Sequence, residues 1–125
     1  MPLMFLNGGA MRGGPLHHLL GDAQLVRVAM TAPRYRFYSV DDRFPALEEV
    51  ESGGVGVHGE LYDLPWRTLR DFLLPSEPAE LELGVIELDD GDGSLAMVRR
   101  RAFAEPETFL DISAYADWRA YTASV

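Results

Sequence analysis

Short strand-like segments, mostly consecutive and separated by turn signals, dominate this sequence. They are rich in β-branched and aromatic residues or alternate apolar with polar side chains, which is typical of strands. Clusters of glycine, proline or aspartate stand between them and favour turns. The predicted strands are residues 3–6, 25–30, 35–40, 55–64, 81–88 and 95–98. The DDGDG cluster at residues 89–93 predicts that the last two strands form a hairpin.

Helical patterns are fewer than strand patterns. Pro15 and Gly21 bracket a predicted helical turn or two, and two amphipathic helices are predicted over residues 65–74 and 111–121. Their apolar positions are Trp66, Leu69, Phe72 and Leu73 in the first and Ile112, Tyr115 and Trp118 in the second. Few helices among consecutive strands favour an α+β fold with a closed or half-closed, antiparallel-rich sheet. A length of 125 residues predicts one domain, residues 1–125.

Acidic side chains outnumber basic ones by twenty to eleven, and the formal net charge is −9. Such a charge opposes approach to a polyphosphate, so nucleic acid is not expected as a partner. An acidic ligand would need a local cluster of donors or arginines to be held. The sequence has no cysteine, and no run approaches the roughly 20 apolar residues of a membrane helix. We therefore expect a cytoplasmic protein without membrane contact.

The glycine-rich segment that follows the first predicted strand is a candidate binding loop. Asn7, Gly8 and Gly9 leave the strand, and glycine permits the conformations in which consecutive backbone N–H groups point at a carboxylate or an oxyanion. A tight turn without a ligand has the same composition. Arg12, a little further on, is a candidate for bidentate binding of a carboxylate or carbamate, or else an exposed loop arginine.

Two residue types are candidates for acid/base chemistry. Glu60 stands on the polar face of a predicted strand, where it is a base if that face lines the interior or a solvated residue if it does not. Histidine is a residue type suited to acid/base chemistry near neutral pH, and on a helix at most one of His17 and His18 faces a cavity. His18 is the favoured catalytic candidate, and a surface pair is the alternative. No His, Asp and Glu set has metal-ligand spacing, so neither metal nor cofactor is expected.

Several blocks resemble the gamma-glutamylcyclotransferase-like, or AIG2-like, superfamily. Residues 5–14 (FLNGGAMRGG) with 17–21 (HHLLG) are similar to its glycine-rich opening, and residues 34–38, 44–47 and 57–64 (VHGELYDL) match further blocks in the same order. The resemblance implies a small mixed β-barrel with flanking helices and a cavity rimmed by the glycine-rich loop. It extends the candidate binding residues to Asn7, Gly8, Gly9 and Ala10, and favours His18 over His17.

The C-terminal half resembles a narrower branch, the C-terminal domain of allophanate hydrolases. Its closing blocks are similar to residues 81–91 (LELGVIELDDG) and 111–121 (DISAYADWRAY). The resemblance implies decarboxylation of an N-carboxylated carbamate, a reaction of small-nitrogen metabolism. This chain has Ala10 where that family usually has a histidine. It also has Ser76 where the cyclotransferases have a catalytic glutamate, and Glu77 stands one residue away, either as a loop residue on the surface, the favoured interpretation, or as a displaced acid.

Two functions follow from these residues. The first is a metal-free enzyme, a lyase or cyclotransferase type, acting on a small amide, carbamate or urea-derived carboxylate through Glu60, one histidine and Arg12. The second is a noncatalytic partner of an amidase or allophanate hydrolase-type enzyme, with an exposed apolar patch near Trp66 or Trp118. A homo-oligomer is also possible. Tyr121 is first a packing residue whose hydroxyl could also reach a ligand.

Overall fold

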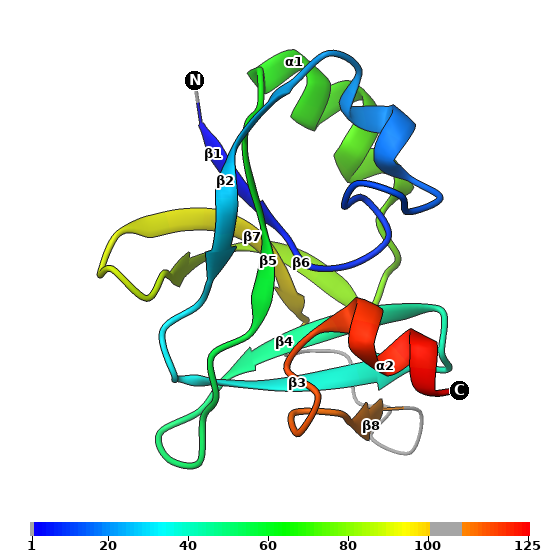
Figure 1. Ribbon diagram of the computed structural model, residues 1–125. Coiled ribbons are helices and arrows are strands. Elements are labelled where there is room, and N and C mark those ends of the chain that lie inside the picture. Colours follow the sequence, from blue (N-terminus) through cyan, green and yellow to red (C-terminus); the bar gives the residue numbers. More distant parts are fainter. Residues whose placement is uncertain (1, 101–108) are drawn as a thin grey trace.

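Two sheets form the framework of the protein (Figure 1). The computed structural model describes residues 2–100 and 109–125. Among these residues, a five-stranded sheet has the order β2-β5-β1-β7-β6 and a three-stranded sheet has the order β4-β3-β8. The strands of the first are β1 (Leu3–Leu6), β2 (Gln24–Met30), β5 (His58–Asp63), β6 (Leu81–Glu87) and β7 (Gly93–Arg99). Those of the second are β3 (Tyr35–Val40), β4 (Phe44–Glu49) and β8 (Phe109–Asp111).

The five-stranded sheet curls until its two edges meet at one end. Its pairings are antiparallel except for β1 with β7, which run parallel. A single bridge joins Thr31, just after β2, to Leu88, just after β6. Two backbone hydrogen bonds of 2.9 Å flank this bridge, from Ala32 N to Glu87 O and from Asp89 N to Met30 O. The α+β class is confirmed, but the barrel is not closed, because β2 and β6 meet only at these ends.

Most predicted strands and the hairpin at residues 81–98 are confirmed, and β4 and β8 are additions. The sequence did not indicate a strand at β4, because Pro45 interrupts it. Proline lacks the N–H that a central strand must donate, but β4 is the edge of its sheet, where one face of the backbone needs no partner. The β4 strand carries Phe44 and Pro45 to the side of the glycine-rich loop, where they contribute to the cavity described below.

The helical segments are short. The turn after Pro15 forms a 3-10 helix, η1 (His17–Leu20), as predicted. Residues 66–76 are continuously helical but change type, through α1 (Trp66–Thr68), the π-helical η2 (Leu69–Leu73) and the 3-10 helix η3 (Leu74–Ser76). Leu69 and Leu73 are buried as expected, whereas Trp66 and Phe72 are 65 % and 55 % exposed. The apolar face of this helix is therefore only partly covered.

The predicted helix over residues 111–121 is wrong in its first half. Asp111 ends strand β8, and the Ile112 N–H donates to Phe37 O at 2.7 Å, so sheet pairing continues past this residue. Helix α2 (Trp118–Ser124) begins only after Asp117, whose Oδ1 accepts a hydrogen bond from Arg119 N at 2.9 Å. The apolar residues of this segment do have helical spacing. However, the backbone groups of Asp111 and Ile112 form hydrogen bonds with β3, so they are not available for a helix.

The core lies between the sheets and leaves no room at some glycines. On Gly59, the second residue of β5, a Cβ would lie 2.5 Å from both Leu6 O and Phe5 Cζ. Both atoms belong to the buried β1 strand, so neither can move freely. We expect Gly59→Ala to lower the free energy of unfolding by about 1–3 kcal/mol, as overpacked cores do. Urea unfolding measures this loss of stability. Gly91→Ala is a contrast: the new Cβ would have no atom within 4 Å, and its cost would come from the backbone φ of 92° instead of from overpacking.

Candidate functional site

The glycine-rich loop between β1 and η1 is held by its own backbone. Met11 N donates to Gly8 O at 3.1 Å, Gly14 N to Met11 O at 2.9 Å and Leu16 N to Gly9 O at 2.9 Å. A Cβ on Gly14 would lie 2.1 Å from Gly9 O, so this close approach requires glycine. Within the described residues, the N–H groups of Gly8, Gly9 and Ala10 have no acceptor. The loop is thus rigid and keeps spare donors.

A cavity of about 250 Å³ lies beside this loop. Its polar lining comes from residues 7–10 of the loop, from Arg43 on the β3–β4 turn, and from Ser76 and Glu77 at the end of η3. Apolar side chains complete it: Phe5, Leu6, Leu16, Phe44, Pro45, Pro78, Leu81 and Met97. The Asn7 Nδ2 amide is buried and has no hydrogen-bond partner among the described residues. A residue that lines the cavity therefore has an unused donor.

Glu77 lies in this cavity rather than free on the surface. Its side chain is half-buried, and the chain enters an extended conformation there, with φ of −77° and ψ of 142°. Burial raises the pKa of its carboxyl to about 7. Neighbouring Ser76 is engaged elsewhere, since its Oγ donates to Leu73 O at 2.6 Å. The favoured interpretation of Glu77 as a surface loop residue was wrong, because its side chain is half-buried and lines the cavity.

Arg43 is a cavity residue that the sequence did not reveal. Its Nη2 lies 3.7 Å from both Asp41 Oδ2 and Glu80 Oε2, which leaves both ion pairs loose. Its guanidinium carbon also lies 5.1 Å from the centre of the Phe44 ring. A partly exposed arginine with weak partners at a cavity rim can bind a carboxylate. No local sequence motif marks Arg43 as a site residue. It is identified only by its position in the folded structure, where it lines the same cavity as the glycine-rich loop.

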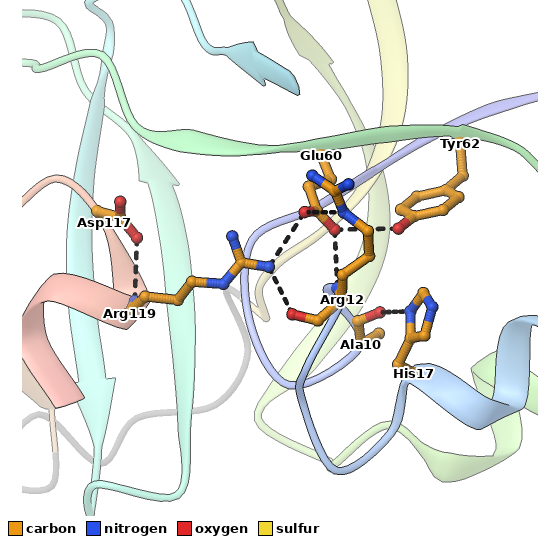
Figure 2. A network of polar contacts seen from close by, with 7 residues as sticks. All are labelled: Ala10, Arg12, His17, Glu60, Tyr62, Asp117 and Arg119. Atoms are coloured by element: carbon orange, nitrogen blue, oxygen red, sulfur yellow. Dashed lines mark hydrogen bonds and ion pairs between the residues drawn. The ribbon is translucent and has the colours of Figure 1, made fainter. Parts of the chain in front are cut away.

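Glu60 forms the centre of a separate polar network (Figure 2). Its carboxylate is 1 % exposed and accepts hydrogen bonds from Arg12 N at 2.8 Å and from Arg12 Nε, Tyr62 Oη and Arg119 Nη2 at 3.0 Å each. Burial would raise the pKa of Glu60, but these hydrogen bonds outweigh it and lower the pKa to about 2. Glu60 does not line the cavity.

These contacts bear on two predicted site residues. A carboxylate with a pKa of about 2 is a poor base near neutral pH, and its oxygens are already occupied. The Arg12 guanidinium donates to Glu60 through Nε and is half exposed outside the cavity. A catalytic Glu60 and a ligand-binding Arg12 stay predictions that the geometry does not favour. What the network does is hold the glycine-rich loop against β5.

The side chains of His17 and His18 point in different directions, because adjacent residues on a helical turn cannot face the same side. Figure 2 shows His17 turned toward the loop, where its Nδ1 lies 3.0 Å from Ala10 O, and its ring centre is 6.0 Å from that of Tyr62. His18 is exposed on η1. Neither lines the cavity. The preference for His18 as a catalytic residue has no support from its position.

Tyr121 also lies away from the cavity. It is buried on α2, packs against Trp118 with ring centres 5.7 Å apart, and donates its hydroxyl hydrogen to Asp42 Oδ1. The structure thus brings Asn7, Gly8, Gly9 and Ala10 together at one cavity, and leaves out His18, Arg12, Glu60 and Tyr121. It adds Glu77 and Arg43.

The sequence matches the family model described as the allophanate hydrolase C-terminal domain over residues 2–123. The chain belongs to this family. The match covers almost the whole chain, from β1 to α2. Among curated proteins, none matches the sequence.

Solved structures agree with the family assignment. A uropathogenic E. coli-specific protein is 33 % identical, with a TM-score of 0.89, and the alignment covers 99 % of this chain and 97 % of that one. Kluyveromyces lactis allophanate hydrolase has 22 % identity and a TM-score of 0.89 over 98 % of this chain, which spans only 21 % of that enzyme. A mouse AIG2-like protein has 23 % identity and a TM-score of 0.65, with 86 % and 82 % covered. The last two similarities show the fold alone.

Two further features of the described residues concern cofactors and membranes. No three His, Cys, Asp or Glu side chains are grouped there in a way that could hold a metal ion. In the same part of the chain, every helix is too short or too polar to cross a membrane.

Proposed function

We propose that the cavity binds a small carboxylate, carbamate or amide and that Glu77 is its acid/base group. The observation that carries this proposal is a half-buried carboxyl, with a pKa of about 7, in the same cavity as the glycine-rich loop. A group with a pKa near neutral can both give and take a proton under physiological conditions. Glu77 thereby takes the role that the sequence assigned to Glu60.

The polar groups that share the cavity with Glu77 are mainly donors. They comprise the Asn7 Nδ2 amide, the free N–H groups of residues 8–10 and the Arg43 guanidinium. A ligand rich in acceptor oxygens satisfies such a set, and an anionic oxygen does so best. The cavity volume of about 250 Å³ lies below the roughly 300–1,000 Å³ of pockets for drug-sized ligands, which supports a small ligand. The acidic chain therefore has a local donor cluster of the kind an anion needs.

The chemistry proposed is lyase- or cyclotransferase-type proton transfer, in line with the family and its small-nitrogen context. In either case Glu77 exchanges a proton with a ligand nitrogen or oxygen while the loop donors hold the developing negative charge. Ala10 has no side chain that could transfer a proton. The proposed reaction therefore depends on Glu77 alone for this step. A cytoplasmic location goes with this proposal and stays a prediction.

A noncatalytic role beside an amidase or an allophanate hydrolase-type enzyme is the second candidate. It is supported by the exposure of Trp66 and Phe72 on one helical segment, and by a similar domain that makes up 21 % of the K. lactis enzyme. Trp118, the other predicted patch residue, is only 8 % exposed and packs against the core. The exposed surface around Trp66 is therefore the candidate contact surface for the partner in the second hypothesis.

Ligand binding tests the first proposal. In a thermal-shift and calorimetric screen at pH 7, we expect small carboxylates or carbamates to raise the melting temperature, because a ligand of the native state stabilises it. Arg43→Met should weaken binding by about 10- to 100-fold, the loss of one charged hydrogen-bonded contact. If binding is followed by turnover, Glu77→Gln should slow it by about 100-fold or more.

The matched controls are Arg70→Met and Glu51→Gln, which change exposed residues outside the cavity. They should leave affinity and turnover unchanged. Binding that survives both Arg43→Met and Glu77→Gln would place the ligand elsewhere. If no carboxylate, carbamate, urea or amide binds at all, the small-molecule proposal fails. A pull-down with an amidase chain, with and without Trp66→Ser, then tests the second candidate.

A further inference from the structure

The C-terminal helix α2 contacts the glycine-rich loop through Arg119. Its Nη2 donates to the Arg12 carbonyl oxygen at 2.6 Å and to Glu60 Oε2 at 3.0 Å (Figure 2). One guanidinium thus links α2 to the loop backbone and to the buried carboxylate that also accepts from Arg12 N. The side chain is half exposed, so it forms these bonds from outside the core. Arg119 therefore holds Arg12, which lies two positions after the cavity segment 7–10.

The same helix contacts the β3–β4 turn through Tyr121. Asp41 and Asp42 form the centre of this turn with φ of 55° and 59°, and Arg43 N closes it by donating to Val40 O at 3.0 Å. Residues with side chains adopt this left-handed conformation at a cost, so other contacts must maintain it. Here the Asp42 side chain accepts from the Tyr121 hydroxyl, and Ser39 Oγ accepts from Asp42 N at 3.1 Å.

Both segments held by α2 are walls of the cavity. The loop contributes residues 7–10, and the turn leads directly into Arg43, Phe44 and Pro45. The two walls also touch, because a Cβ on Gly8 would lie 2.7 Å from Pro45 Cδ. Residues two positions apart on one short helix thus hold two chain segments that meet at the cavity. A small displacement of α2 would move both walls.

We propose that α2 is a positioning element, in which Arg119 holds the glycine-rich wall of the cavity and Tyr121 holds the Arg43 wall. Neither residue touches the cavity itself. The helix has seven residues and depends on tertiary contacts for its stability, chiefly the buried Trp118 and the Asp117 cap. Its docking, rather than any contact with a ligand, then determines the width of the cavity and how much water reaches Glu77.

The test uses the whole chain and two readouts that need no ligand. Amide hydrogen exchange reports on the walls, and a ¹³C NMR titration of the Glu77 carboxyl reports on hydration of the cavity. In Arg119→Ala we expect exchange at Met11 and Arg12 to rise about tenfold relative to the buried β1 amides. In Tyr121→Phe, which removes only the hydroxyl, we expect a similar rise at Arg43.

Both variants should also let water reach Glu77, so the midpoint of its titration should fall from about 7 toward its ordinary value of 4.5. Arg43 is the charged side chain that shares the cavity lining with Glu77, and it is unchanged in these variants. Arg70→Ala and Tyr115→Phe are the controls, and neither should alter exchange at the walls or the midpoint. Tyr115 lies near α2, and among the described residues its hydroxyl has one hydrogen bond, accepted from Ser124 Oγ at 3.3 Å.

An unchanged Glu77 midpoint in folded Arg119→Ala and Tyr121→Phe would overturn the proposal, and so would faster exchange at both walls and in β1 alike. If Arg119→Ala does not fold, Arg119→Lys keeps the charge on a shorter side chain without the planar guanidinium, and it should still raise exchange at Arg12. Neither readout requires binding or turnover. A failed ligand screen would therefore leave this inference standing, and its own failure would leave the proposed binding site untouched.

Discussion

Glu60→Gln is expected to lower the free energy of unfolding by about 3 kcal/mol at pH 7, because it removes the charge that satisfies two arginines in a buried network. The glutamine keeps the volume but loses charge-assisted hydrogen bonds with Arg12 and Arg119. Breaking a fully buried pair costs about 3–5 kcal/mol, and we expect the lower end because both arginines are half exposed and regain water.

The pH dependence of the wild type provides a second measure of the same network. The pKa of Glu60 is about 2 in the folded protein and 4.5 in the unfolded chain. The folded state therefore binds fewer protons than the unfolded chain between these values, and stability falls as the pH falls. This contribution is complete above about pH 5 and lost by about pH 2. The difference between wild type and Glu60→Gln should shrink over that range.

Urea unfolding at pH 7, 4 and 2.5 measures both effects. Glu82→Gln is the control. In the described part of the chain Glu82 forms one ion pair, an exposed contact of 3.8 Å with Arg100, so this change should alter stability by less than about 0.5 kcal/mol. A Glu60→Gln protein within about 1 kcal/mol of the wild type at pH 7 would show that the network contributes little. That result would also reopen a catalytic role for Glu60.

Glu77→Gln is expected to have the opposite effect and to stabilise the protein by about 2–3 kcal/mol at pH 8. Burial raises the pKa of Glu77 from 4.5 to about 7, so the folded state holds a proton that the unfolded chain has already lost. Stability therefore falls as the pH rises from 4.5 through 7. The neutral glutamine removes this cost above pH 7 and leaves stability nearly unchanged at pH 4.

Thermal or urea unfolding between pH 4 and pH 8.5 measures this difference. Glu51→Gln, an exposed change, should give a curve parallel to the wild type throughout. If Glu77→Gln is no more stable than the wild type at pH 8, then the Glu77 carboxyl is hydrated and the fold does not raise its pKa. The proposed acid/base role would lose its main support. Functional sites often retain a buried charge at a cost in stability, so a substitution that removes the charge stabilises the protein.

Part of the candidate site was predictable from the sequence because its signals are local. Two glycines after a short strand predicted a loop with free donors, and residues 7–10 do line the cavity. The alternation in β5 placed Glu60 and Tyr62 on one face, and both are buried. Local alternation could not show that Arg12 and Arg119, which are 48 and 59 residues from Glu60, would occupy its carboxylate.

The amino-acid sequence by itself determined most of the strand pattern, the hairpin, the α+β class and the glycine-rich loop, since these follow from periodicity and turn chemistry over a few residues. Tertiary structure alone decided that Asp111 joins a sheet, that Glu77 is half-buried, that Glu60 is paired with two arginines, and that Arg43 lines the same cavity as the loop. The physical reason is that the protonation and reactivity of a charged group depend on its solvent exposure and its partners. In this fold those partners come from segments far apart in the chain.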